Sequence, residues 1–269
     1  MPDDLPNAAN TGPLLTTRTL GRHLEFHACI DSTNRRAKAI ALSPDTPEGT
    51  VVVADQQTAG RGRMTRQWRS PAGLNLYLSA ILRPSAPPQT IPQIALLAAI
   101  ALHQALHDLL PELTFGLKWP NDLWSHTGRK LSGILCEATF AGADCAVIAG
   151  IGVNVNDSIA NFPPDLQQTA ATLADLAGHT LPRPQLLAAL LNRLEPLLDD
   201  WQPHASLEHL LPYWNQHDIL RGRPITVQDG DDILSGTAGG ILPDGRLILD
   251  THSGQRLIHA GDTHILASC

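Results

Sequence analysis

Apolar residues in the first two thirds of the chain follow the spacings of strands and helices. Val51-Val52-Val53, within residues 50–54, is a short continuous apolar run typical of a buried strand. From Leu74 to Leu82, leucine or alanine occupies every second position, which predicts a long strand with one strongly apolar face. Further strands are expected over residues 115–124, 130–140 and 145–155, with one or two short ones over 14–27.

Helical spacing is clearest over residues 91–110, where Ile94, Leu97, Ala101 and Leu109 lie on one stripe. Other helices are expected over residues 35–42, after the start signal Asp31-Ser32-Thr33, and over 169–177, 184–201 and 204–216. The polar segment 56–70 is expected to be a loop, and residues 1–13 a flexible tail. Strands clustered in the middle with helices packed beside them predict an α+β fold.

The pattern changes near residue 217. Four turn signals follow at short intervals, at Asp229-Gly230, Asp244-Gly245, Ser253-Gly254 and Ala260-Gly261, with short β-type runs between them. This spacing predicts a small all-β barrel of about five strands. We therefore expect two domains, over residues 14–217 and 218–269.

Composition narrows the class of protein. The chain has 269 residues, 43% of them hydrophobic, which is enough for a sizeable core. No apolar run approaches the roughly 18 residues that span a bilayer, and the N-terminus lacks a signal-peptide pattern. The net charge of −7 argues against a general binder of nucleic acids or anionic membranes. A cytoplasmic protein without DNA or membrane partners is expected.

Cysteine and histidine give little sign of a metal site. Cys29, Cys136, Cys145 and Cys269 show no CxxC spacing and are interpreted as buried small side chains of a reduced protein. His103 and His107 are four residues apart on an expected helix and could bind a metal, but no third ligand lies nearby in the sequence. A solvated helix face is the preferred interpretation of this pair.

The first chemically unusual segment runs from Gly60 to Arg69. Four arginines fall within nine residues without one acidic residue among them: Arg61, Arg63, Arg66 and Arg69. Gly60 and Gly62 let the backbone approach a ligand closely. Guanidinium groups on such a loop favour anion binding over a merely solvated basic loop.

Two further segments contain lysine, which this chain otherwise avoids: its three lysines are Lys38, Lys118 and Lys130, against 16 arginines. Lys118-Trp119-Pro120-Asn121-Asp122 brings an amide and a carboxylate together after a proline; it is equally typical of a turn and of a Mg²⁺-phosphate site. In Lys130-Leu131-Ser132-Gly133, the glycine leaves room for a ligand against the sheet.

Two common nucleotide signatures are absent from the sequence. Residues 150–156, Gly-Ile-Gly-Val-Asn-Val-Asn, lack the third glycine of the dinucleotide fingerprint and open no clear helix. No GxxxxGK[ST] motif occurs in the chain. A nucleotide would therefore have to bind without a P-loop.

Taken in order, these segments resemble the biotin protein ligase family. The resemblance rests on Ser32-Thr33-Asn34, on Gln57 with residues 60–63, on residues 118–122 and 130–137, and on residues 150–156. It implies a catalytic domain related to class II aminoacyl-tRNA synthetases and lipoate ligases, followed by an SH3-like barrel. It also implies that biotin and ATP, with Mg²⁺, form biotinyl-5′-AMP, and that biotin is then transferred to one lysine of a biotin carboxyl carrier protein.

The resemblance assigns roles residue by residue. The biotin-binding residues it implies are Ser32, Thr33, Asn34, Gln57, Arg61, Gly62, Arg63, Lys130 and Gly133, with Lys130 and Arg63 as catalytic residues. Those implied for ATP and the adenylate are Arg66, Asn121, Asp122 and Asn154, with Asp122 also as a Mg²⁺ ligand.

The sequence departs from the family pattern at two places. After the Gly-Arg-Gly-Arg core, many members continue with another Arg-Gly-Arg or similar, whereas this chain has Met64-Thr65-Arg66, which leaves the mobility of the loop open. Only 31 residues precede Ser32, too few for the winged helix-turn-helix domain of repressor-type members. This is consistent with the short form of the ligase, without DNA binding.

Two other functions stay open at this level: a lipoate–protein ligase, and a non-catalytic biotin-binding regulator. The arginine loop and residues 118–122 favour biotin over lipoate, and Lys130 with Asp122 favours an enzyme. The oligomeric state is not predicted.

Overall fold

The structure, a computed structural model, describes residues 4–64, 66–141, 144–230 and 232–266. A seven-stranded sheet has the strand order β1-β2-β3-β7-β6-β5-β4. All neighbouring strands are antiparallel except β1 and β2, which are parallel. The strands are β1 (Leu24–His27), β2 (Val51–Ala54), β3 (Leu76–Leu82), β4 (Phe115–Lys118), β5 (Asp122–Ser125), β6 (Lys130–Ala141) and β7 (Asp144–Val153).

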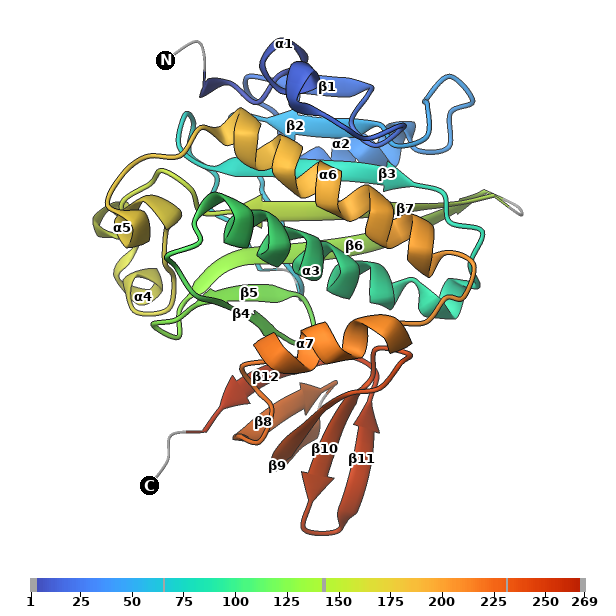
Figure 1. Cartoon of the computed structure of the whole chain (residues 1–269), viewed down its shortest axis with the longest axis vertical. Coiled ribbons are helices and arrows are strands. Elements are labelled where there is room, and N and C mark those ends of the chain that lie inside the picture. Colours follow the sequence, from blue (N-terminus) through green and yellow to red (C-terminus); the bar gives the residue numbers. More distant parts are fainter. Residues whose placement is uncertain (1–3, 65, 142–143, 231, 267–269) are drawn as a thin grey trace.

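Helices cover both faces of this sheet. The long helices α3 (Pro92–Leu109) and α6 (Arg183–Trp201) lie side by side across one face (Figure 1). Leu76, Leu78 and Ala80, alternate residues of β3, belong to the core that they cover. On the other face, α2 (Thr33–Ile40) buries Ala37 against Ile81 in a smaller cluster. The alternation seen in the sequence thus separates the two faces, although every residue of β3 is buried.

The C-terminal part forms a second sheet of five antiparallel strands, as expected for the small β-rich domain. Its order is β11-β10-β9-β8-β12, and it lies beyond the β4–β5 edge of the large sheet (Figure 1). The strands are β8 (Pro224–Asp229), β9 (Asp232–Ile241), β10 (Leu247–Thr251), β11 (Gly254–Ile258) and β12 (Asp262–Ile265). We call this unit the C-terminal sheet. The α+β class is confirmed.

The single strand expected over residues 115–124 is wrong. The chain reverses at Trp119–Asn121, and β4 and β5 form a tight antiparallel hairpin in which Lys118 pairs with Asp122. Proline cannot donate a ladder hydrogen bond, and Pro-Asn-Asp is typical of turns, so the turn chemistry overrides the apolar pattern. The hairpin places Lys118 and Asp122 side by side at the edge of the sheet.

Several helix bounds also differ from the predictions. The expected helix 169–177 is shortened to α5 (Leu173–Ala177), because Thr172 caps its start and residues 169–171 hydrogen-bond alongside Lys130. In place of a helix over 204–216, the chain forms the 3₁₀ turn η5 (Glu208–Leu210) and then α7 (Leu211–His217). The short elements η3 (Pro88–Thr90), η4 (Ile159–Asn161) and α4 (Pro164–Gln167) were not predicted.

The N-terminal segment is tied to the protein over its described residues 4–13, which the sequence analysis assigned to a flexible tail. It forms α1 (Ala8–Thr11) and the turn η2 (Gly12–Leu14). Asp4 pairs with the buried Arg183 at 2.8 Å, an interaction between residues far apart in the chain. Between residues 14 and 27 only β1 forms, because Glu195 accepts the backbone N–H groups of Thr19 and Leu20.

One helix reaches the length and mean hydropathy of a membrane span, although glutamine and histidine interrupt its apolar residues, so the expected absence of a long apolar run is not contradicted. It covers residues 88–109, so it contains α3, and 67% of its most apolar window is buried inside the protein. Packing against the sheet and α6 accounts for its composition.

His103 is buried at 2% exposure, so the predicted solvated histidine face is wrong there, whereas His107 is exposed.

The cysteines also differ from expectation. Cys29 is exposed, and Cys136 and Cys145 are only partly covered; Cys269 lies outside the described residues.

Candidate active site

A cleft of about 830 Å³ opens on the sheet face that carries α2, and it extends to the C-terminal sheet. Its volume is typical of a small-molecule site. Every residue that the resemblance assigned to biotin, ATP or catalysis lines it: Ser32, Thr33, Asn34, Gln57, Arg61, Gly62, Arg63, Arg66, Asn121, Asp122, Lys130, Gly133 and Asn154. These residues come from α2 and from loops and strands between residues 32 and 154, so the fold brings together residues that are far apart in the sequence.

The floor of the cleft is made by glycines on adjacent strands. Gly133 of β6 pairs with Gly152 of β7. A Cβ atom at Gly152 would lie 2.5 Å from Nε1 of Trp68, and one at Gly133 would lie 3.2 Å from the same indole. Gly152 therefore leaves the space that the Trp68 indole occupies against the sheet. Trp68 was not among the predicted site residues, because Gly133 and Gly152 come together only when β6 and β7 pair.

A polar network closes one end of the cleft. Thr33 donates from its backbone N–H to Oε1 of Gln57 at 2.9 Å. Ser79 of β3 donates to Oδ1 of Asn34 at 2.6 Å, and Asn34 donates through Nδ2 to Glu137 at 3.0 Å. Gly150 makes room for this amide, because a Cβ there would lie only 1.9 Å from Oδ1 of Asn34. The network holds donors and acceptors in fixed positions, as recognition of a polar ring system requires.

The arginine loop (residues 60–69, described over 60–64 and 66–69) lines the cleft from both of its described parts. Within it, Gly62 N–H donates to the Arg66 carbonyl oxygen at 2.7 Å. Arg61 forms an ion pair with Glu137 at 3.2 Å, and Arg69 pairs with the fully buried Asp157. Met64 has a φ of 52°, in the left-handed region that glycine adopts without cost. The departure at Met64 thus falls where a glycine would relieve backbone strain; Thr65 lies outside the described residues.

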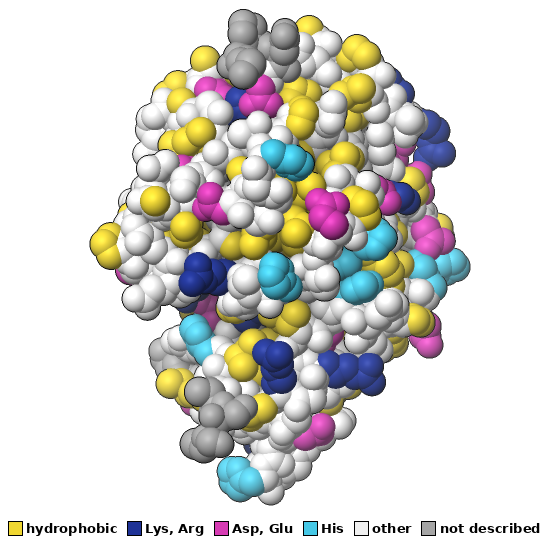
Figure 2. All heavy atoms as spheres, turned by 60° about the vertical axis from the view of Figure 1, so that its left-hand side comes forward, with side chains coloured by type: hydrophobic (Ala, Val, Ile, Leu, Met, Phe, Trp, Pro, Cys, Tyr) yellow, Lys and Arg dark blue, Asp and Glu magenta, His cyan; other side chains and the backbone are white. Residues whose placement is uncertain are grey.

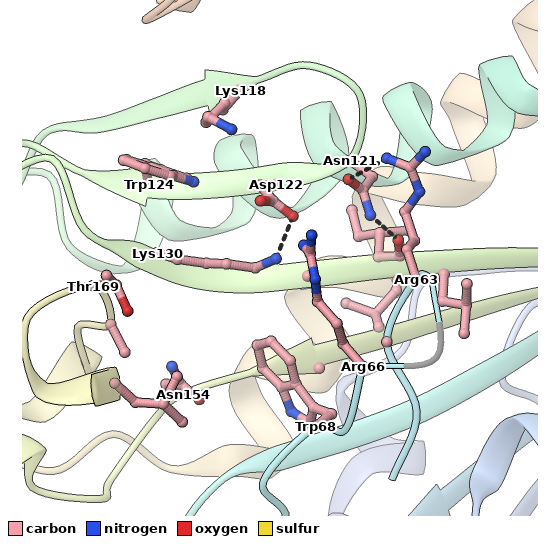
Figure 3. Close-up of a pocket in the computed structure, with 18 of the residues that line it drawn as sticks. Arg63, Arg66, Trp68, Lys118, Asn121, Asp122, Trp124, Lys130, Asn154 and Thr169 are labelled. Carbon is pink, nitrogen blue, oxygen red and sulfur yellow. Dashed lines mark hydrogen bonds and ion pairs between the residues drawn. The ribbon is translucent and has the colours of Figure 1, made fainter. Parts of the chain in front are cut away.

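Arg63 and Arg66 both meet Asp262 of β12. Nη1 of Arg63 lies 3.6 Å from Oδ1 of Asp262, and Arg66 pairs with Oδ2 of the same carboxylate. Arg63 also donates to Oδ1 of Asn121 at 3.4 Å, and the close-up shows Asn121 and Arg63 side by side (Figure 3). Asp262 was not predicted, because almost 200 residues separate it from the loop.

Lys130 and Asp122 face each other across neighbouring strands. Nζ of Lys130 lies 2.7 Å from Oδ1 of Asp122, and both are drawn at the centre of the cleft in Figure 3. The ammonium also lies 5.8 Å from the Trp68 ring centre. A cation that is partnered by one carboxylate and an aromatic face can be offered to an anionic ligand.

Lys118 is the second lysine of the cleft and is buried at 6% exposure. Its ammonium donates to the Thr263 carbonyl oxygen at 2.7 Å and lies 5.0 Å from the Trp124 ring centre. Burial lowers the pKa of Lys118 to about 8, and the positive charge of Lys130 adds to this effect, whereas Asp122 opposes it.

Asn121 and Asn154 are held by the backbone. Nδ2 of Asn121 donates to the Ile134 carbonyl oxygen, and Nδ2 of Asn154 donates to that of Ala171 at 3.1 Å. Asn154 follows β7, and its own carbonyl oxygen accepts the first N–H of α5 at Leu173. Both amides are thus fixed in orientation at the ends of strands.

The comparisons with known proteins agree with this geometry. The chain matches the model of the "Biotin/lipoate A/B protein ligase family" over residues 26–154 and that of the "Biotin protein ligase C terminal domain" over residues 221–263. The first match contains all the predicted site residues, and the second contains Asp262 and most of the C-terminal sheet.

Full-length relatives extend the match over most of the chain. It is 37% identical over 253 residues to "Bifunctional ligase/repressor BirA" of Bacillus subtilis, which is 93% of this chain and 76% of that protein. It is 32% identical over 246 residues to "Biotin--[acetyl-CoA-carboxylase] ligase" of Mycobacterium tuberculosis, 90% of this chain and 88% of that protein.

A solved structure shares the fold. It is the "Biotin protein ligase from Aquifex aeolicus in complex with biotin and ATP", which superimposes with a TM-score of 0.78 at 29% identity, over 92% of this chain and 100% of that one. The fold and the site residues agree with two relatives that are more than 30% identical to this chain and are each matched over at least three quarters of their length, so this chain belongs to the biotin protein ligase family.

Proposed function

We propose that this protein is an ATP-dependent biotin–protein ligase that activates biotin as biotinyl-5′-AMP and then transfers it to a lysine of a biotin carboxyl carrier protein. The observation that carries the proposal is one glycine-floored cleft with a polar network at one end and the Lys130–Asp122 pair with the arginine loop at the other. It can hold a neutral ring system and, next to it, a reacting pair of anions.

In the first step, an oxygen of the biotin carboxylate attacks the α-phosphorus of ATP, and the bond to the leaving pyrophosphate breaks. Two anions must approach each other, which requires preorganised positive charge. Lys130 holds the carboxylate, and Arg63 and Arg66 hold the phosphates. Ser32, Thr33, Asn34 and Gln57 hold the ring system, while Trp68 covers it from the loop.

In the second step, the neutral amine of the carrier lysine attacks the acyl carbon, AMP leaves, and the amine loses a proton. No nucleophile of the enzyme is required. The mixed anhydride must be kept from water until the carrier arrives, and the arginine loop is the segment that can exclude it.

Mg²⁺ is part of the proposal. Among the described residues no group of three or more His, Cys, Asp or Glu side chains could hold a metal ion. Mg²⁺ at phosphates is usually held by one or two carboxylates, with substrate oxygens and water completing the shell, and Asp122 fits that pattern. Asp122 would hold the ion, which would supply positive charge beside the phosphates.

We further propose that residues 14–217 and 218–269 are the catalytic and SH3-like domains, and that the protein works in the cytoplasm, where its carrier would be. The relative of Mycobacterium tuberculosis carries the carboxylase in its name, which supports a carrier of that class.

The test is turnover with defined components. The full chain is incubated with ATP, Mg²⁺, biotin and a carrier domain, and the carrier is weighed by mass spectrometry. A gain of one biotinyl group at one lysine is expected. Parallel reactions with lipoate test the lipoate-ligase alternative, and biotin binding without any mass gain would instead favour the non-catalytic regulator.

A further inference from the structure

Two arginines of the loop share one carboxylate that belongs to the other sheet. Arg63 and Arg66 both pair with Asp262, and Arg63 also donates to the Gly261 carbonyl oxygen at 3.2 Å. The Asp262 side chain is 12% exposed, against 24% for Arg63 and 60% for Arg66. A carboxylate so sheltered interacts with its partners more strongly than a surface ion pair does.

The segment that carries Asp262 is held rigidly against the large sheet. Where β4 ends and the hairpin turn begins, Lys118 donates to the Thr263 carbonyl oxygen at 2.7 Å, and the Thr263 hydroxyl donates to the Trp119 carbonyl oxygen at 2.9 Å. Gly261 has a φ of 150°, and a Cβ there would lie 2.6 Å from the Gln228 backbone oxygen. These contacts therefore fix the position of Asp262 relative to the large sheet.

The arginine loop, by contrast, contains no acidic residue that could neutralise its own four arginines. Near the two ends of the loop, Arg61 forms an ion pair with Glu137 and Arg69 forms one with Asp157. Between them, Arg63 and Arg66 have Asp262 as their carboxylate partner among the described residues. The middle of the loop is thus anchored by charge to the C-terminal sheet.

We propose that Asp262 is a positioning residue that anchors the arginine loop across the cleft, so that the C-terminal sheet sets how long the activated intermediate is retained. This inference rests on the proposed function. With Asp262 in place, both guanidinium groups are poised for the phosphate of biotinyl-AMP, and the loop excludes water from the anhydride. Without the charge, the middle of the loop opens more often and the intermediate escapes.

The direct test is the Asp262→Asn variant, which keeps the shape of the side chain and removes its charge. The enzyme is loaded with labelled biotin and ATP without a carrier, and release of biotinyl-AMP is followed after a chase. Loss of the charge that both arginines share is expected to speed release about tenfold. Asp262→Glu should restore most of the retention. Asp244→Asn is the matched control: Asp244 pairs with Arg246 in a turn of the same sheet, away from the loop.

A second readout needs no ligand. Trypsin cleaves after arginine, so the rate of cleavage after Arg61, Arg63 and Arg66 in the ligand-free full chain reports how often the loop opens. Faster cleavage is expected in Asp262→Asn, and added salt should speed cleavage of the wild type more than that of the variant.

The outcomes separate the two claims. Unchanged release and unchanged cleavage in Asp262→Asn would overturn the anchoring role, and slower release would show instead that the carboxylate competes with the phosphate. If the wild type forms no biotinyl-AMP, the proposed function fails, and the cleavage experiment alone decides whether Asp262 anchors the loop.

Discussion

Lys130 is the residue on which the chemistry depends most. It opens β6 beside Gly133, where a ligand has room, and its ammonium is paired with Asp122 at 2.7 Å. Arginine at this position would not be equivalent, because a compact ammonium fits between a carboxylate and an aromatic face where a planar fork does not. The chain has only three lysines, and two of them line the cleft.

Replacement of Lys130 by alanine removes the charge that faces the biotin carboxylate. Loss of one preorganised donor to developing charge is expected to slow adenylate formation about a hundredfold. Biotin-dependent exchange of pyrophosphate into ATP measures this rate, and the melting temperature checks the fold. Lys38→Ala, on the exposed end of α2, is the control and should exchange at the wild-type rate. A near-normal exchange rate in Lys130→Ala would show that Lys130 takes no part in adenylate formation.

At the level of residues, the sequence predicted the cleft lining better than the contacts within it. Residues 32–34, 57, 60–63 and 130–133 are recognisable because family motifs are local in sequence. Trp68 and Asp262 were missed for a physical reason. The role of Trp68 depends on glycines that meet only when β6 and β7 pair, and the role of Asp262 depends on how two sheets dock.

The strands β6 and β7 provide the surface on which a ligand would lie. Their glycines at 133, 150 and 152 leave space above the sheet, which Trp68 and Asn34 partly occupy. The turn between β4 and β5 then brings Lys118 and Asp122 to the same edge. Apolar patterning located these strands, but not the hairpin, because the pattern continues across a turn that proline and asparagine make.

Replacement of Gly152 by alanine tests the role of this floor. The added Cβ would lie 2.5 Å from the Trp68 indole nitrogen, so the indole must move away from the sheet. We expect the KM for biotin to rise about tenfold, equivalent to about 1.4 kcal/mol of binding free energy, while the melting temperature changes little. Gly12→Ala is the control, since nothing lies within 4 Å of its Cβ. An unchanged KM would show that Trp68 does not shape the biotin site.

At the scale of the whole molecule, a cluster of histidine and tyrosine rings joins α3, β4 and α7. Where α3, β4 and α7 meet, His103 lies against Tyr213 and His217. A backbone carbonyl can only accept, so Nε2 of His103 donates to the Phe115 oxygen at 3.2 Å and Nδ1 accepts from the Tyr213 hydroxyl at 2.7 Å. Acceptance at Nδ1 requires the neutral imidazole, because a protonated ring carries a hydrogen on both nitrogens. This cluster braces β4, from which the hairpin of the cleft begins.

Burial lowers the pKa of His103 to about 4, and the nearby His217 and His107 act in the same direction. The unfolded chain takes up a proton on His103 near pH 6.5, whereas the folded protein does so only near pH 4. The free energy of unfolding is therefore highest above about pH 6.5 and falls as the pH drops toward 4. Over that interval the wild type should lose about 3 kcal/mol of unfolding free energy that His103→Gln retains. Urea unfolding at several pH values measures this difference.

His252→Gln is the control, at an exposed position in the turn between β10 and β11. It should follow the pH profile of the wild type. Parallel profiles for the wild type and His103→Gln would mean that His103 is not held neutral by the fold.

Transfer of biotin to a carrier is the measurement that tests the account most directly. The full chain, ATP, Mg²⁺, biotin and a carrier domain are combined, and the mass of the carrier is followed with time for the wild type and Lys130→Ala. We predict that the wild type adds one biotinyl group to one carrier lysine, only when ATP is present, and that Lys130→Ala does so about a hundredfold more slowly. A carrier that gains no mass with the folded wild type would contradict the assignment of this cleft as a biotin–protein ligase site.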